Sequence, residues 1–199
     1  MPATKPDRRV LRTRELLLDS FISLLVERGY EKMTVQHLLD RASVGRATFY
    51  AHFRNKEDLL SASVGRLEVG LRRAWKKGHA ETGPSSEPLG FTRAFFRHID
   101  GHRAILHQIV GRVSEVTVDR QIRRMLSRLV RDDLVACGRA KRGSAALEFT
   151  VQFVVGALWS IIVWWAAARS GPTPDELNEL FHRLALPGLD AISRQNIAW

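Results

Sequence analysis

The chain has 199 residues and an ordinary globular composition, with 45% hydrophobic and 26% charged residues. This length allows a small module joined to a larger one, and the composition excludes a long disordered tract. A single cysteine, Cys137, excludes an internal disulfide framework, so we expect a cytoplasmic protein. The formal net charge is +10, and most of the excess lies within residues 1–80, which favours a polyanionic partner for that part of the chain.

Two helices are predicted before residue 43. Apolar residues recur at helical spacing over residues 11–28, and Gly29 supplies the stop. Thr34 is a typical N-cap residue for a short second helix whose buried face includes Leu38 and Leu39. Both helices are therefore expected to be amphipathic.

A tight turn at Ser43 and Val44 leads into a third short helix. Phe49 and Phe53 stand one turn apart and are predicted to face the core. The side chains that then face away from the core are polar or basic, and they are Arg46, Thr48, Tyr50 and His52.

The rest of the chain shows only helical periodicity. A helix capped by Asn55 is predicted over residues 56–77, followed by a surface loop rich in Gly, Pro and Ser over residues 78–90. Further helices are predicted over residues 91–100, 102–110, 114–136, 144–168 and 173–186, and Pro187 and Gly188 are expected to end or kink the last one. We therefore expect an all-α fold of about nine helices.

Residues 34–56 combine two short amphipathic helices with a tight turn, which is the pattern of a helix-turn-helix. The second helix of such a motif lies in the major groove, so its outward side chains must meet base edges and phosphates. Arg46 can make a bidentate contact with guanine, and Thr48 can touch a thymine methyl group. The predicted phosphate contacts are Thr34, Tyr50, His52 and Lys56. The alternative roles are structural, a cap for Thr34 and solvated surface charges for Arg46 and Lys56.

The residues from Thr34 to Gln36 and from Ala42 to Leu59 resemble the DNA-binding domain of TetR-family repressors. The resemblance covers about residues 10–60 and implies a two-fold homodimer with the third helix in the major groove. It also implies a larger C-terminal domain that binds a small effector and dimerises through its last two long helices. We therefore expect a helix-turn-helix domain over residues 1–60 and an effector-binding and dimerisation domain over residues 61–199. The family's groove-facing positions fall on Gln36, Gly45, Arg46, Ala47, Thr48, Tyr50, Ala51, His52 and Lys56.

Two positions depart from the family pattern, which usually has glycine where Ser43 stands and a serine-like cap where Gly45 stands. A left-handed Ser43 costs about 1 kcal/mol, which a packed domain tolerates. Gly45 can cap a helix, although the missing side chain removes one hydrogen bond and one DNA contact. Neither change is expected to alter the fold.

The larger domain is expected to hold both an effector pocket and the dimer interface. Effector pockets are mostly apolar with a few polar groups, and the candidates are Phe95, Phe96, His102, Phe149, Phe153 and Trp159. Each of these residues can equally belong to the core. The resemblance places the dimer interface on the last two helices, where the candidates are Val155, Leu158, Ile162, Trp165, Leu177, Leu180, Phe181 and Leu184.

Three other interpretations compete with this one. Residues 149–168 lack charge and are long enough to span a bilayer, but their polar residues and tryptophans favour a buried helix, so no membrane partner is expected. His98 and His102 have a spacing that can hold a metal, yet Gly101 favours a helix break, and we predict neither a metal nor a cofactor. No nucleophile can be assembled with its base, so enzymatic activity is disfavoured.

The sequence predicts a sequence-specific transcriptional regulator, most simply a repressor that a small-molecule effector of unknown identity releases from palindromic, double-stranded operator DNA. A dimer must present its two recognition helices about 34–36 Å apart, and an effector that prefers another separation lowers operator affinity. The helix from Lys56 onward joins the modules and is the candidate coupling element. Two alternatives stay open: a non-specific DNA-binding protein, and a small-molecule-binding helical protein without a working helix-turn-helix.

Overall fold

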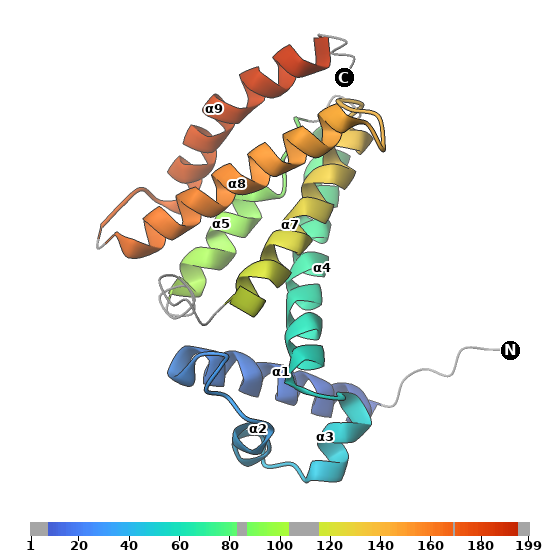
Figure 1. The fold of residues 1–199 in the computed structure, drawn as a ribbon, viewed down its shortest axis with the longest axis vertical. Coiled ribbons are helices and arrows are strands. Elements are labelled where there is room, and N and C mark those ends of the chain that lie inside the picture. The colour runs from blue at the N-terminus through green and yellow to red at the C-terminus, as the bar shows by residue number, and fades with distance from the viewer. Residues whose placement is uncertain (1–7, 83–86, 104–115, 169, 195–199) are drawn as a thin grey trace, which may run out of the picture.

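The computed structural model describes residues 8–82, 87–103, 116–168 and 170–194. These residues form eight α-helices and no strand, which confirms the all-α prediction (Figure 1). The helices are α1 (Arg8–Arg28), α2 (Val35–Ala42), α3 (Arg46–His52), α4 (Lys56–Thr82), α5 (Thr92–Gly101), α7 (Val116–Ala136), α8 (Ala145–Ala167) and α9 (Pro174–Arg194). The helix predicted over residues 102–110 lies largely outside the described residues.

Helices α1, α2 and α3 form a small unit at one end of the molecule, below the long α4 in Figure 1. Phe21, Leu38 and Phe49, one from each helix, are fully buried in its core. On the outside, Arg41 of α2 pairs with Glu27 of α1 at 2.5 Å, and this hydrogen bond holds the pKa of Glu27 below its ordinary value. The core and the ion pair together fix α2 against α1.

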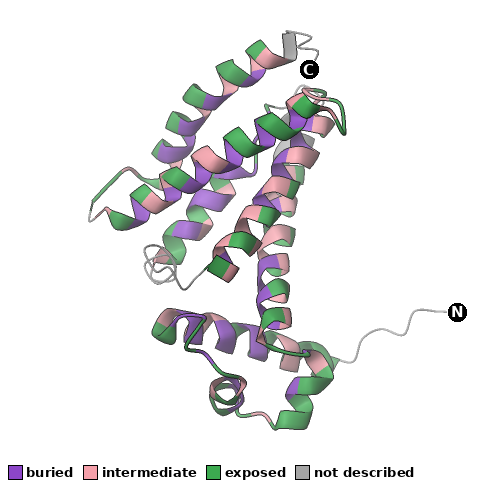
Figure 2. Cartoon of the chain, in the orientation of Figure 1, coloured by how far each residue is buried: buried purple, intermediate pink, exposed green. Residues whose placement is uncertain are grey.

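Helices α5, α7, α8, α9 and the upper part of α4 form the larger unit. Helix α7 packs against α4 and α8, and α9 packs against α5 and α8. Figure 2 shows the buried faces of these helices turned toward one another. Buried Asp133 of α7 accepts hydrogen bonds from Trp75 Nε1 of α4 and from Leu89 N, so one carboxylate joins three segments of this core.

Helix α4 runs from the small unit into the larger one and is tied to α7 by ion pairs. Arg128 of α7 donates to Glu68 at 2.6 Å, and Arg72 donates to Asp132 of α7 at 2.8 Å. Burial raises the pKa of Glu68, but the hydrogen bonds from Arg128 and Arg72 outweigh burial and hold this pKa below its ordinary value. The upper part of α4 is thus joined to the larger unit by charge as well as by packing.

Two helices are longer than the sequence predicts. Helix α4 continues to Thr82, beyond the predicted end at residue 77. Helix α9 continues through Pro187 to Arg194, although a proline inside a helix removes one backbone hydrogen bond. Ala185 and Leu189, on either side of Pro187, are both buried, so tertiary packing keeps this stretch helical.

Among the described helices, α8 alone is long and apolar enough to cross a membrane. In the structure 44% of its most apolar 18-residue stretch is buried inside the molecule, and the helix packs against α7 and α9. The core helix of a globular protein has the same length and composition, so the membrane interpretation gains little from this helix.

Candidate nucleic-acid interface and effector cavity

The turn between α2 and α3 has the backbone geometry that the sequence predicts. Thr34 begins α2 by accepting a hydrogen bond from His37 N at 3.3 Å, and the His37 ring accepts one from Thr34 N. Ser43 ends α2 with φ 51° and ψ 43°, which confirms the left-handed serine. Gly45 caps α3 without a side-chain hydrogen bond, as expected. These caps set the direction in which α3 leaves α2.

Helix α3 has an aromatic inner face and a largely polar outer face. Phe49 and Phe53 are buried as predicted, and Arg14 of α1 lies 4.6 Å from the centre of the Phe53 ring. This packing prevents α3 from rotating about its axis, because a rotation would expose both rings. The predicted DNA-contacting residues that are exposed are Thr34, Gln36, Gly45, Arg46, Ala47, Thr48, Tyr50 and Ala51, while His52 and Lys56 are half-buried.

Arg46 of α3 and Gln36 of α2 are brought together across the turn. Arg46 Nη2 donates to Gln36 Oε1 at 3.1 Å, and Gln36 Nε2 donates to Asp40 Oδ1 at 2.8 Å. The bond to Gln36 uses one of the five N–H donors of the Arg46 guanidinium. Arg46 is therefore held in place by Gln36 while it retains donors for a base or a phosphate.

Lys56 has structural partners that the sequence does not reveal. Its Nζ donates to the carbonyl oxygens of Tyr30 at 3.1 Å and Met33 at 3.3 Å, and lies 4.4 Å from the centre of the Tyr30 ring. The ammonium thus fastens the start of α4 to the turn before α2. A phosphate contact by Lys56 stays a prediction and would use the third N–H of the ammonium.

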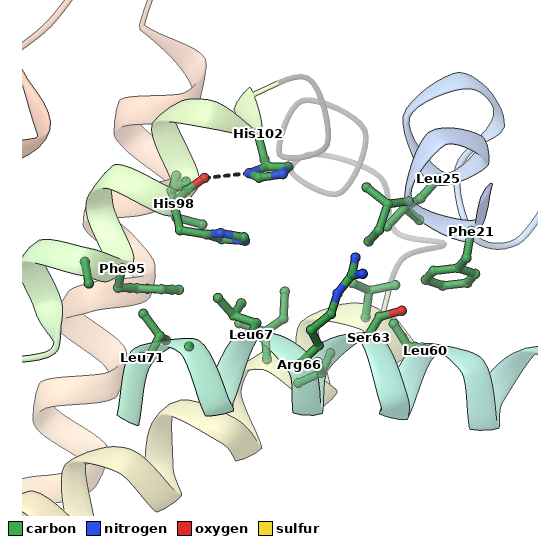
Figure 3. Close-up of a pocket in the computed structure, with 17 residues that line it drawn as sticks. Phe21, Leu25, Leu60, Ser63, Arg66, Leu67, Leu71, Phe95, His98 and His102 are labelled. Carbon is green, nitrogen blue, oxygen red and sulfur yellow. Dashed lines mark hydrogen bonds between the residues drawn. The ribbon is translucent and has the colours of Figure 1, made fainter. Parts of the chain in front are cut away.

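A cavity of about 390 Å³ lies between α1, α4, α5 and α7 (Figure 3). Most of its wall is apolar, and the lining includes Phe21, Leu25, Leu67 and Phe95. Three nitrogen-bearing side chains also line it, and Figure 3 shows them facing the same space: Arg66, His98 and His102. A cavity of this size and polarity can enclose a small organic molecule.

The two histidines of the cavity stack on each other. Their ring centroids are 4.3 Å apart, and His102 Nδ1 donates to the carbonyl oxygen of His98 at 2.8 Å. Burial, followed by the charges of His102 and Arg66, lowers the pKa of His98 from 6.5 to about 4. His98 is therefore neutral near pH 7. Among the described residues, no group of three or more His, Cys, Asp or Glu side chains could hold a metal ion.

Arg66 is the charged residue among the cavity residues that sequence reasoning missed. Its Nη1 donates to Glu15 Oε2 at 2.8 Å and to Asp19 Oδ1 at 2.9 Å, so it ties α4 to α1. Ser63 and Leu67 of the same helix also line the cavity, but an arginine that is 41% exposed gives no sequence signal of a cavity position.

Two of the six predicted effector residues, Phe95 and His102, line the cavity. Phe96 does not, because it is buried between Trp165 and Phe181, with ring centroids 6.4 Å and 6.3 Å away. The assignment of Phe96 to the pocket is therefore corrected to the core. Neighbouring residues of a helix point to different sides, and only the fold tells which side meets the cavity.

The three effector candidates on α8 also lie away from the cavity. Trp159 is buried, with the Arg123 guanidinium 4.8 Å from its ring centre. Phe149 and Phe153 point outward and are 59% and 57% exposed. None of the three is among the cavity residues, so these assignments are corrected as well.

The predicted dimer residues fall into two groups. Six of them are buried within the protomer, because α8 and α9 turn this side toward α5, α7 and each other: Val155, Leu158, Ile162, Trp165, Leu177 and Phe181. Leu180 and Leu184 of α9 are 51% and 79% exposed. The buried six are therefore corrected to core residues, and the exposed pair remains available to a partner.

Exposed apolar side chains gather elsewhere on the same two helices. Phe149, Phe153 and Trp164 of α8 lie at helical spacing on its outer face. With Leu180 and Leu184 of α9 they form what we call the α8–α9 outer face. Large apolar groups left open on a globular protein usually mark a binding surface.

The exposed α3, set beside α2 by a tight turn, defines a helix-turn-helix protein. The family model described as bacterial regulatory proteins, tetR family, matches residues 17–63. An uncharacterized HTH-type transcriptional regulator from Bacillus subtilis (strain 168), YxbF, is 43% identical over 61 residues, which are 30% of this chain and 16% of that protein. The chain thus matches only a small part of that curated relative.

Solved structures resemble nearly the whole chain. A TetR transcriptional regulator from Streptococcus agalactiae 2603V has a TM-score of 0.65 and 24% identity, covering 90% of this chain and 96% of its own. FadR of Thermus thermophilus, a TetR-family repressor in complex with lauroyl-CoA, has a TM-score of 0.59 and 22% identity, covering 88% and 94%. Residues 17–63 thus match the tetR family of bacterial regulatory proteins, and the described chain shares the all-helical fold of these solved structures.

Proposed function

We propose that the protein is a sequence-specific DNA-binding transcriptional regulator, a repressor that a small-molecule effector releases from a palindromic operator. The observation that carries this proposal is the outer face of α3, where Arg46, Thr48 and Tyr50 are exposed above a buried aromatic core. A helix held in this way can enter the major groove without losing its own packing. The proposed DNA contacts are those the sequence predicts, with Gln36 acting also as a support for Arg46.

We place the dimer interface on the α8–α9 outer face. A homodimer that joins two copies of this face would cover Phe149, Phe153 and Trp164, which water meets in the single chain. A two-fold axis on this face that runs along the long axis of the molecule would also place two copies of α3 at the same end of the assembly, as a palindrome requires (Figure 1). The family's regulators support a dimer, and the face itself supports the location.

The effector is proposed to bind in the cavity between α1, α4, α5 and α7. FadR of Thermus thermophilus, which shares the fold, is in complex with lauroyl-CoA. In the present chain the cavity touches both α1 of the small unit and α4, which continues into the larger unit. We therefore assign DNA binding to residues 1–60 and effector binding with dimerisation to residues 61–199, in a protein that acts in the cytoplasm without enzymatic activity.

Selection of bound duplexes from a random pool tests the proposal most directly. We expect enrichment of a palindrome whose half-sites are about one helical turn apart, since two copies of α3 must read one face of the duplex. Arg46→Ala should relax the base preference at one position of each half-site, at a cost of about 1–3 kcal/mol. Arg73→Ala, which removes an exposed arginine from α4, is the matched control and should leave the selected sequence unchanged.

Two other results would contradict the proposal. Equal affinity for selected and random duplexes at moderate salt would indicate a non-specific DNA-binding protein. An absence of DNA binding even at low salt would leave a small-molecule-binding helical protein.

A further inference from the structure

The cavity carries an arginine whose hydrogen bonds lie at one end of its guanidinium. Both hydrogen bonds that Arg66 makes to described residues come from Nη1, which donates to Glu15 and Asp19 of α1. A guanidinium has five N–H donors, and Nε and Nη2 supply three of them along an edge that matches a carboxylate. Figure 3 shows Arg66 reaching from α4 into the space between Leu67 and Leu25.

The rest of the cavity restricts what could use that edge. His98 and His102 line the same space and bring N–H groups, while the described cavity lining contains no Asp or Glu side chain. The remaining wall is mostly apolar, so a ligand with several charges would leave some of them without a partner. One anionic group on an apolar body fits this distribution of donors and apolar surface.

We propose that the cavity binds a small apolar molecule with a single carboxylate, which pairs with Nε and Nη2 of Arg66, the edge that donates to no described residue, and weakens the bonds of Arg66 to Glu15 and Asp19. This inference rests on the proposed effector role of the cavity and names the chemical class of the effector. The side chains of Glu15 and Asp19 are 57% and 69% exposed, so water and salt screen their charge. The Arg66 side chain is 41% exposed, less than either carboxylate, and an apolar ligand body in the cavity would cover part of it, so a ligand carboxylate can compete for the same cation.

Binding at Arg66 would also affect the small unit, because Arg66 joins α4 to α1. Glu15 and Asp19 belong to α1, which packs against both α2 and α4. A carboxylate that draws Arg66 inward loosens one tie between α1 and α4. The effect on DNA affinity equals the difference in ligand affinity between the tied and the loosened states.

The test uses purified full-length protein without DNA and two pairs of probes, 2-naphthoate with 2-naphthamide and octanoate with octanamide. Each pair keeps the carbon skeleton and changes only the charge, and affinities are measured by calorimetry. We expect each carboxylate to bind at least about tenfold more tightly than its amide. Arg66→Gln should abolish this preference while it changes amide affinity less than about threefold.

A second variant separates binding from the tie to α1. Glu15→Gln combined with Asp19→Asn removes the two competing carboxylates and leaves Arg66 in place. This variant should bind the carboxylate probes more tightly than the wild type and the amides equally well. In the wild type, 2-naphthoate should speed amide hydrogen exchange in the first half of α1, whereas 2-naphthamide should not.

Three outcomes would overturn the inference: equal affinity for acid and amide, a preference that survives Arg66→Gln, or no binding of any of the four probes. None of them depends on DNA. If the duplex selection fails but the protein prefers carboxylates to amides, the proposed function is refuted and the ligand class is supported. If the selection yields a palindrome but the protein shows no carboxylate preference, the proposed function is supported and the ligand class is refuted.

Discussion

Helices α3 and α8 expose opposite chemistry. Helix α3 buries Phe49 and turns Arg46 and Tyr50 outward, whereas α8 buries Val155 and Leu158 and turns Phe149, Phe153 and Trp164 outward. A polar outer face is stable in water and is ready for a polar ligand such as DNA. An apolar outer face lowers its free energy only when another surface covers it.

This difference shows that the two ends of the molecule depend on partners in different ways. The buried residues of both units form one continuous apolar core, to which the small unit contributes Phe21, Leu38 and Phe49, so its fold does not require DNA. The larger unit shares this core, but it leaves five large apolar side chains of α8 and α9 in water. We therefore expect mutations to act through folding in α3 and through association in α8.

The largest expected effect is at the core of the small unit. Phe49→Ala should lower the free energy of unfolding of this unit by about 4 kcal/mol, because a fully buried ring leaves a cavity. Tyr50→Ala, one residue away on the exposed side, should change it by about 0.5 kcal/mol or less. Urea unfolding followed by circular dichroism measures both, and equal losses would contradict the assigned inner and outer faces.

The next largest effect tests the apolar face. Phe153→Glu should weaken dimerisation by at least about 2 kcal/mol, roughly thirtyfold, because it places an unpaired charge in the interface. Sedimentation equilibrium measures the dimer constant, and circular dichroism should show an unchanged helix content. Val69→Glu, at an exposed apolar residue of α4 outside the face, is the control. Equal dimer constants for the two variants would remove the α8–α9 outer face as the interface.

The small unit was largely predictable from sequence because its signals are local. Ser43, Gly45 and the Phe49–Phe53 spacing each report on neighbours within one turn of helix, and the structure places all of them as expected. The positions of Phe49 and Phe53 on the buried side of α3 were enough to predict which residues of this helix face outward. The roles of Lys56 and Arg66 were not predictable, because their partners lie 23 to 51 positions away.

Helix α8 shows why the other sites were assigned less well. Apolar residues lie on all sides of this helix and its few polar residues form no stripe, so its sequence shows little contrast between an inner and an outer face. Val155 and Phe153 are equally good core or interface residues by composition, yet one is buried and the other exposed. Which side meets α7 and α9 depends on long-range packing, and a helix with apolar residues on all sides has no hydrophobic periodicity that would reveal it.

A smaller effect is expected at Ser43, whose backbone is left-handed in the turn between α2 and α3. Ser43→Gly should raise the free energy of unfolding by about 1 kcal/mol, because glycine adopts the left-handed backbone at φ 51° without strain. Ser43→Ala should stay within a few tenths of a kcal/mol of the wild type, since alanine meets the same strain. Thermal unfolding compares the two, and a destabilised glycine variant would show that the serine side chain has another role.

The last effect is confined to a narrow pH range in the larger unit. The pKa of His98 is lowered to about 4 in the folded protein, so the unfolded chain takes up a proton first as the pH falls below 6.5. Stability from the neutral ring is therefore complete above about pH 6.5 and is lost as the pH falls toward 4. His98→Asn should flatten the fall in unfolding free energy between pH 6.5 and 5. Some slope should persist, because burial also lowers the pKa of His182, but a slope identical to the wild type would contradict the assignment.

Because α4 is one continuous helix, a small tilt at one of its ends displaces the other end. Its 27 residues form a rod about 40 Å long at a rise of 1.5 Å per residue. A tilt of about 5° at the cavity end displaces the opposite end by roughly 3 Å in each protomer. In the proposed dimer, symmetry would double that displacement between the two copies of α3 and change their separation relative to the one-turn spacing of the major groove.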